Sequence, residues 1–225
     1  MAMKDFAVTK PRPLPVIILA DISGSMGVDG KIAALNQSLR DMVKSFAAES
    51  RLRAEIHLGL ITFGGEARTD LPLTPAHEIQ DIQELQACGA TPLGAALSLA
   101  RGMVEDKVLI PSRAYRPILV LVSDGLPTDD WEPPFQELKA SERAARATRV
   151  ALAIGNDADE DMLRAFGNDL EAPLFHANNA AEIVRFFRAV TMSVSAHSRS
   201  QSPGQPLRID YNRTESVSDE LDLDF

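Results

Sequence analysis

Short apolar runs that separate longer amphipathic stretches constrain the fold of this chain most strongly. The expected strands 14–20, 117–122 and 149–154 are almost wholly apolar, with little alternation of polar and apolar residues. Parallel strands covered on both faces have this composition, because neither side of the strand meets water. Between the runs, apolar residues recur at spacings of three and four, as from Ile32 to Phe46, which predicts helices.

Strand and helix patterns alternate along the chain. This order predicts an α/β fold that is Rossmann-like and doubly wound, with a mostly parallel central sheet and helices on both faces. A Gly64-Gly65 turn predicts one antiparallel edge strand, at about 67–71. The other expected strands are 54–63 and 174–176, and the expected helices are 31–48, 77–85, 93–104, 135–148, 159–166 and 179–193.

The length of 225 residues fits one domain, which we place at 13–195 after an N-terminal extension at 1–12. Residues 196–225 are polar and then acidic, and predict a flexible acidic tail. The net charge of −9 argues against a nucleic-acid partner, which requires a basic surface. We find no signal peptide and no apolar run long enough to span a membrane, so we expect a cytoplasmic protein.

Oxygen-bearing side chains follow two of the expected strands and precede one helix. Asp21, Ser23 and Ser25 come directly after strand 14–20, Asp124 follows strand 117–122, and Thr91 precedes helix 93–104. Ligands of open α/β sheets bind outside the carboxyl ends of the strands. Hard oxygen ligands suit Mg²⁺, and Mn²⁺ and Ca²⁺ accept them as well. The sequence therefore predicts a divalent-metal site at this edge of the sheet.

The order Asp-x-Ser-x-Ser, Thr, Asp resembles the metal-ion-dependent adhesion site of von Willebrand factor A domains. The strings LPVIILADISGSM, GLITFGG, GATPLGAAL and PILVLVSDGLPTDD are similar to its bacterial TerY-like branch, which is associated with tellurium resistance. This resemblance implies that Ser23 and Ser25 bind the cation directly, Thr91 directly or through water, and Asp21 and Asp124 partly through waters. An Asp or Glu of a partner protein would complete the shell.

The TerY-like branch implies a domain that stands alone in the cytoplasm. Its relatives are encoded near a Ser/Thr protein kinase, a PP2C-type phosphatase and other stress-response components. The resemblance thus points to an interaction module of a tellurite-resistance or stress-response system, with these enzymes as candidate partners.

Three further residues are candidates for a partner-contacting rim around the metal. Met26 lies in the loop after Ser25, and Asp129 and Trp131 follow Asp124. For Asp129 we favour the alternative role of a cap at the start of the helix that follows it. Trp131 is either an exposed anchor for a partner or a residue that packs its helix onto the sheet.

Other functions use similar residues. A Mg²⁺-dependent phosphotransfer or phosphatase site also places Asp and hydroxyl groups at sheet ends. Here Ser23 stands where a dehalogenase-type phosphatase has its second Asp, so we expect no enzyme activity. A third hypothesis makes the chain a kinase and phosphatase substrate that acts as a signalling switch. A carboxylate of 219–224 could also occupy the metal's open position.

Overall fold

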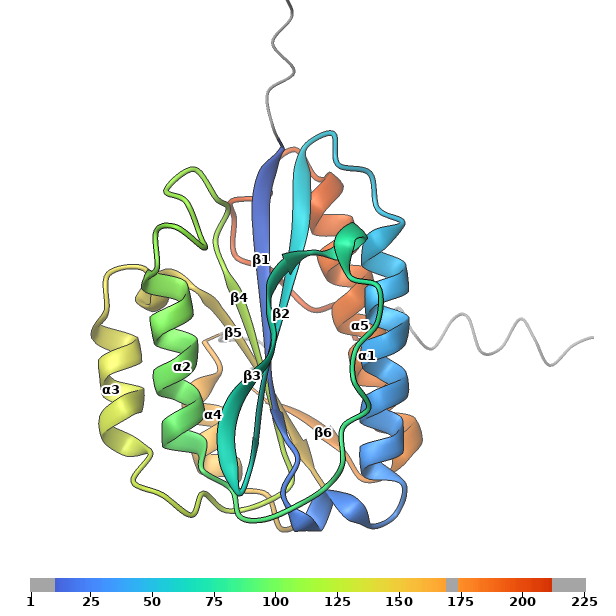
Figure 1. Cartoon of the computed structure of the whole chain (residues 1–225), viewed down its shortest axis with the longest axis vertical. Helices are drawn as coiled ribbons and strands as arrows, with labels where there is room; N and C mark the ends of the chain where they lie inside the picture. The colour runs from blue at the N-terminus through green and yellow to red at the C-terminus, as the bar shows by residue number, and fades with distance from the viewer. Residues whose placement is uncertain (1–10, 169–173, 212–225) are drawn as a thin grey trace, which may run out of the picture.

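The computed structural model describes residues 11–168 and 174–211 (Figure 1). Six strands form one sheet in the order β3-β2-β1-β4-β5-β6, in which β3 pairs antiparallel with β2 and all other pairs are parallel. The strands are β1 (Arg12–Asp21), β2 (Ala54–Gly64), β3 (Glu66–Pro75), β4 (Ile118–Ser123), β5 (Thr148–Ile154) and β6 (Phe175–Ala177). This topology confirms the predicted α/β fold with one antiparallel edge strand.

Five α-helices cover the two faces of the sheet (Figure 1). No helix of residues 11–168 and 174–211 is long and apolar enough to cross a membrane. The helices are α1 (Lys31–Ala47), α2 (Leu93–Glu105), α3 (Glu132–Ala140), α4 (Glu160–Phe166) and α5 (Ala180–Arg199), and the short 3₁₀ helices are η1 (Gly24–Gly27), η2 (Ala76–Glu78) and η3 (Ala144–Arg146).

The alternation of side chains along β1 divides the core in two. Val16 and Ile18 join the cluster that α1 and α5 cover, whereas Ile17 and Leu19 join the cluster that α2, α3 and α4 cover. All four residues are fully buried. Both faces of β1 are apolar from Leu14 to Ala20, and the polar side chain of Asp21 follows at its carboxyl end.

The strand order reverses at β1, which lies between β2 and β4. Ala20 of β1 pairs with Val122 of β4, so the residues after them, Asp21 and Ser123, end their strands side by side. Crevices at such reversal points are where open α/β sheets bind ligands. The pairing therefore brings two of the polar strand ends together.

The predicted helix at 77–85 is wrong. The structure has only η2 there, and residues 79–92 run without regular secondary structure past α1 to the lower edge of the sheet (Figure 1). The side chain of Asn36 donates to the carbonyl of Leu85 at 2.9 Å and accepts from its N–H at 2.8 Å. Because Asn36 takes both backbone groups of Leu85, a helix through that residue would break two buried hydrogen bonds.

The predicted helix at 135–148 ends early, at Ala140. The carboxylate of Glu105 accepts hydrogen bonds from the backbone N–H groups of Arg143 and Ala144 and from the hydroxyl of Ser141. These bonds turn the chain into η3, and β5 begins at Thr148.

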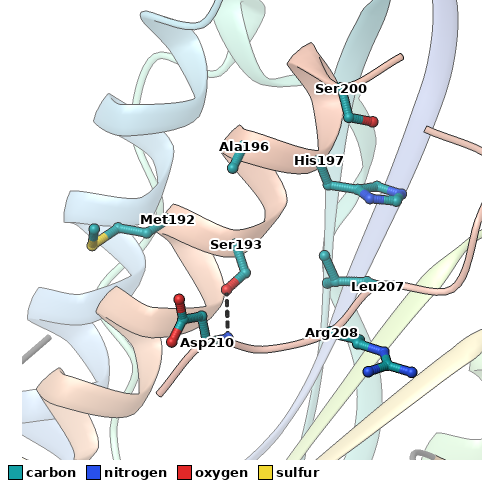
Figure 2. Close-up of a pocket in the computed structure, with 8 residues that line it drawn as sticks. All are labelled: Met192, Ser193, Ala196, His197, Ser200, Leu207, Arg208 and Asp210. Atoms are coloured by element: carbon teal, nitrogen blue, oxygen red, sulfur yellow. Dashed lines mark hydrogen bonds between the residues drawn. The ribbon is translucent and has the colours of Figure 1, made fainter. Parts of the chain in front are cut away.

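The C-terminal part of the chain also differs from the prediction of a tail that begins at residue 196. Helix α5 continues to Arg199, and the chain then returns along it beside a pocket of about 280 Å³ (Figure 2). Leu207 is only 4% exposed, and the N–H of Asp210 donates to the hydroxyl of Ser193 at 3.1 Å. Residues 196–211 therefore belong to the folded domain, and the acidic residues of 212–225 lie outside the described residues.

We expect Leu207→Ala to lower the free energy of unfolding by about 2–4 kcal/mol, because it removes a buried side chain from the core. Leu52→Ala is a matched control, since that leucine is 93% exposed, and we expect it to have little effect. Urea unfolding of both variants measures the difference. Equal stabilities would show that the C-terminal segment does not contribute to the fold.

Stability should also fall as the pH drops below about 6.5. Burial lowers the pKa of His197, whose Nε2 donates to the carbonyl of Pro203 at 2.9 Å. In acid the unfolded chain then binds a proton that the folded chain does not, so stability is lost as pH falls. His197→Gln should weaken this dependence between about pH 5 and 7, and parallel pH profiles for wild type and variant would contradict the prediction.

Candidate metal centre

The carboxylate of Asp21 lies at the centre of the site and is fully buried. One oxygen accepts the hydroxyl of Ser123 at 2.6 Å, and the other accepts the backbone N–H of Ser23 at 2.8 Å. The first bond follows from the pairing of β1 with β4, and the second from the tight turn that starts η1. Among the described residues, no cationic side chain pairs with Asp21.

A directed chain of hydrogen bonds joins Ser23, Ser25 and Asp124. The hydroxyl of Ser25 donates to Oδ1 of Asp124 at 2.7 Å, and the hydroxyls of Ser23 and Ser25 lie 3.0 Å apart. Because Ser25 has one proton and gives it to Asp124, Ser23 is the donor to Ser25. Lys31 donates to Oδ2 of Asp124 at 2.8 Å, so each oxygen of that carboxylate accepts a hydrogen bond.

Thr91 reaches the site on a loop that is clamped between two turns. The N–H of Gly24 donates to the carbonyl of Gly89 at 3.0 Å, and the N–H of Gly65 donates to the carbonyl of Ala90 at 2.8 Å. Gly89 has φ +70°, and a Cβ on it would lie 2.5 Å from the backbone of Gly65. Only glycine fits this conformation and this close approach.

The hydroxyls of Thr91 and Ser25 face the same small space. A Cβ built on Gly125 would lie 3.8 Å from Oγ1 of Thr91 and 3.9 Å from Oγ of Ser25. Thr91 is held there by Thr128, which accepts its N–H at 3.0 Å and donates its own N–H to the Thr91 carbonyl at 2.9 Å. The structure thus brings all five predicted metal-site residues to one edge of the sheet.

Burial, as the main cause, raises the pKa of Asp21 above its ordinary value, and the nearby charge of Asp124 adds to this effect. Hydrogen bonds from Ser123 and Ser23 act in the opposite direction. A bound cation would offset the cost of burying these charges. The hydroxyl proton of Ser25 points to Asp124, and its oxygen, which accepts one hydrogen bond from Ser23, keeps a second lone pair for a cation.

Binding of a cation at this site would depend on neutral hydroxyl oxygens as much as on carboxylate charge. Among residues 11–168 and 174–211, no three His, Cys, Asp or Glu side chains gather where they could hold a metal. The site instead combines two carboxylates with three hydroxyls. This donor set fits Mg²⁺ or Mn²⁺, which prefer oxygen ligands and retain bound waters.

The predicted rim residues have other roles. Met26 is fully buried, so its assignment to a partner-contacting rim is wrong. Asp129 accepts the N–H groups of Gly94 and Ala95 at 2.9 and 3.0 Å and therefore caps α2, not the helix that follows it. Trp131 is half-buried and packs against the ring of Phe135, with centroids 5.7 Å apart.

Two polar residues of the site were not predicted from the sequence. Ser123 immediately precedes Asp124, and its role depends on the register between β1 and β4. Lys31 was assigned only to the start of α1. Its place in the first turn of a helix is electrostatically unfavourable, and this is the signal that could have singled it out.

Comparisons with known proteins agree with the observed fold. A family model described as von Willebrand factor type A domain matches residues 16–189. The uncharacterized protein YfbK of Escherichia coli is 27% identical over 154 residues, which are 65% of this chain and 26% of YfbK.

Two solved structures share the fold. Proximal thread matrix protein 1 from the mussel byssus, with a zinc-occupied MIDAS motif, has a TM-score of 0.64 and 19% identity over 81% of this chain and 48% of its own. Manganese-loaded TRAP protein of Plasmodium vivax has a TM-score of 0.55 and 18% identity over 78% of this chain and 72% of its own. The chain thus spans about a quarter of YfbK and about half of the mussel protein.

We expect Asp129→Ala to lower the free energy of unfolding by about 1–2 kcal/mol, because the first turn of α2 loses its cap. Its exposed neighbour provides the control, since Asp130→Ala should change stability by less than about 0.5 kcal/mol. Thermal denaturation of the two variants side by side measures the effect. Equal losses of stability in the two variants would indicate that the negative charge of the loop, and not the cap of α2, stabilises the fold.

Proposed function

This chain belongs to the von Willebrand factor type A family, and from that premise we propose that it binds a partner protein through a divalent cation. Asp21, Ser23, Ser25, Thr91 and Asp124 would hold the ion. The observation that carries the proposal is the hydrogen-bonded network that joins Asp21, Ser23, Ser25 and Asp124 at the carboxyl ends of β1 and β4, with the hydroxyl of Thr91 beside it. Domains of this family are typically interaction modules, and we propose that this one is likewise not an enzyme.

The expected ligand on the partner is an Asp or Glu side chain. When bound, a divalent cation supplies a Lewis-acidic centre to which a carboxylate can bind in place of water. The chain's own part is to hold the oxygens in place: Asp21 is fixed by two hydrogen bonds, and Ser25 by its bond to Asp124. We propose Mg²⁺ as the native ion, with Mn²⁺ and Ca²⁺ as ions that the same oxygens accept.

Exposed apolar side chains beside the site suit a protein partner. Val28, in the loop between η1 and α1, is 54% exposed, and Leu126, two residues after Asp124, is 65% exposed. They replace Met26 as candidates for partner contact. The buried core of a protein interface is more apolar than the surrounding surface, so these side chains are suited to burial against a partner.

We also propose membership of the TerY-like branch and a role in tellurite resistance or a related stress response in the cytoplasm. The strings ADISGSM, GATPLGAAL and LVSDGLPTDD support this placement. A Ser/Thr kinase and a PP2C-type phosphatase are the proposed partners. Capture from native lysate with and without EDTA, followed by mass spectrometry, tests these identities.

Metal binding should be lost in Asp21→Asn, which keeps the size of the side chain but removes its charge. Ser25→Ala should weaken binding by about 10-fold or more, because it removes one proposed ligand. Ser25 is exposed, so this variant should fold normally. Isothermal titration with Mg²⁺ and Mn²⁺ measures the affinities, and Asp130→Asn is the control that removes an exposed charge from a nearby loop.

Partner capture should follow metal binding. We expect EDTA and Asp21→Asn to abolish it together, and Asp130→Asn to leave it intact. Metal affinities that do not differ among the variants, or capture that EDTA does not affect, would overturn the proposed mechanism.

A further inference from the structure

Lys31 places a positive charge inside the proposed metal site. Its Nζ lies 2.8 Å from Oδ2 of Asp124, whose side chain is fully buried, and its own side chain is only 17% exposed. Of the two acidic groups in the site, Asp124 therefore already has a cationic partner, whereas Asp21 has none among the described residues. The ammonium and a divalent ion would share the same carboxylate.

Lys31 lies at the N-terminus of a helix, a position where a positive charge is unfavourable. It is the first residue of α1, a helix that has no acidic residue in its first turn and no side-chain cap. A positive charge at a helix N-terminus is repelled by the helix dipole. The ion pair with Asp124 compensates for this repulsion, because it is short and largely shielded from water.

The turn before Lys31 is also conformationally costly. Asp29 has φ +54° and Gly30 has φ +71°, so two consecutive residues adopt the left-handed region, and one of them is not glycine. A non-glycine residue in this region costs free energy that the surrounding structure must supply. The turn directs the first residue of α1 toward the carboxyl end of β4.

The ammonium of Lys31 also lies close to the backbone that follows β5. Gly155 follows β5, and a Cβ built on it would lie 3.9 Å from Nζ of Lys31. The lysine head is thus enclosed between the ends of β4 and β5. A charge in such a confined position interacts more strongly with its neighbours than one on the open surface does.

From these observations we propose that Lys31 is a built-in counter-cation that competes with the divalent ion for Asp124 and sets a low metal affinity. This inference rests on the proposed function. With two ionised carboxylates, the site carries a net charge of −1 with the lysine and −2 without it, and repulsion between the ammonium and a divalent ion opposes metal binding. The same ion pair stabilises the buried carboxylate when no metal is bound.

The test is isothermal titration of Mg²⁺ and Mn²⁺ into wild type, Lys31→Met, Lys31→Arg and Lys44→Met. We expect Lys31→Met to bind metal about 10-fold more tightly or better, because it removes the competing charge. Lys31→Arg keeps the charge and should resemble wild type. Lys44→Met is the matched control, because Lys44 is exposed on the same helix.

A second readout separates competition from a loss of structure. In EDTA, Lys31→Met should melt at a lower temperature than wild type and Lys44→Met, and saturating Mn²⁺ should raise its melting temperature more than theirs. Equal or weaker metal affinity of Lys31→Met, with binding intact in wild type, would overturn the role of Lys31 alone. Absence of metal binding in all four proteins would overturn the proposed function, and the inference with it.

Discussion

The pairing of β1 with β4 is the contact on which the candidate site depends. Its register places Asp21 beside Ser123, and the residue after Ser123 is the second carboxylate, Asp124. Both strands are buried on both faces, so a shift of register would move apolar residues out of a close-packed core. Packing of the apolar strands therefore fixes the positions of Asp21 and Asp124, although burial of a carboxylate is by itself unfavourable.

The buried charges are balanced by hydrogen bonds in a particular order. Asp21 relies on a hydroxyl and a backbone N–H, whereas Asp124 relies on a hydroxyl and the ammonium of Lys31. The two carboxylates are thus unequal, although each follows an apolar strand. A divalent cation would therefore stabilise Asp21 more than Asp124. Asp124 would interact with both the divalent ion and the ammonium of Lys31.

Much of the fold could be predicted from periodicity. The apolar runs identified the parallel strands, and the three-and-four spacing of Ile32 to Phe46 identified α1. Errors arose where side chains bind backbone groups far away in the sequence. Asn36 holds Leu85 in an extended loop, and Glu105 ends α3 early, and neither effect leaves a local pattern.

The same limit applies to the site. Its five metal-site residues were predicted because each follows a strand or precedes a helix, and the structure brings them together. That Met26 points inward, that Asp129 caps α2 and that Lys31 pairs with Asp124 depend on contacts between distant segments. The metal-binding role itself stays a prediction.

The loop that carries Thr91 has no regular secondary structure of its own. The amide hydrogens of Gly24, Gly65, Cys88, Thr91 and Thr128 all take part in hydrogen bonds between this loop and its neighbours. Such bonds can open locally without unfolding of the sheet. The hydroxyl of Thr91 is therefore part of the site only while these hydrogen bonds are formed. The lifetime of the complete site is set by the rate at which this one loop opens, and hydrogen exchange of the loop amides would measure that rate.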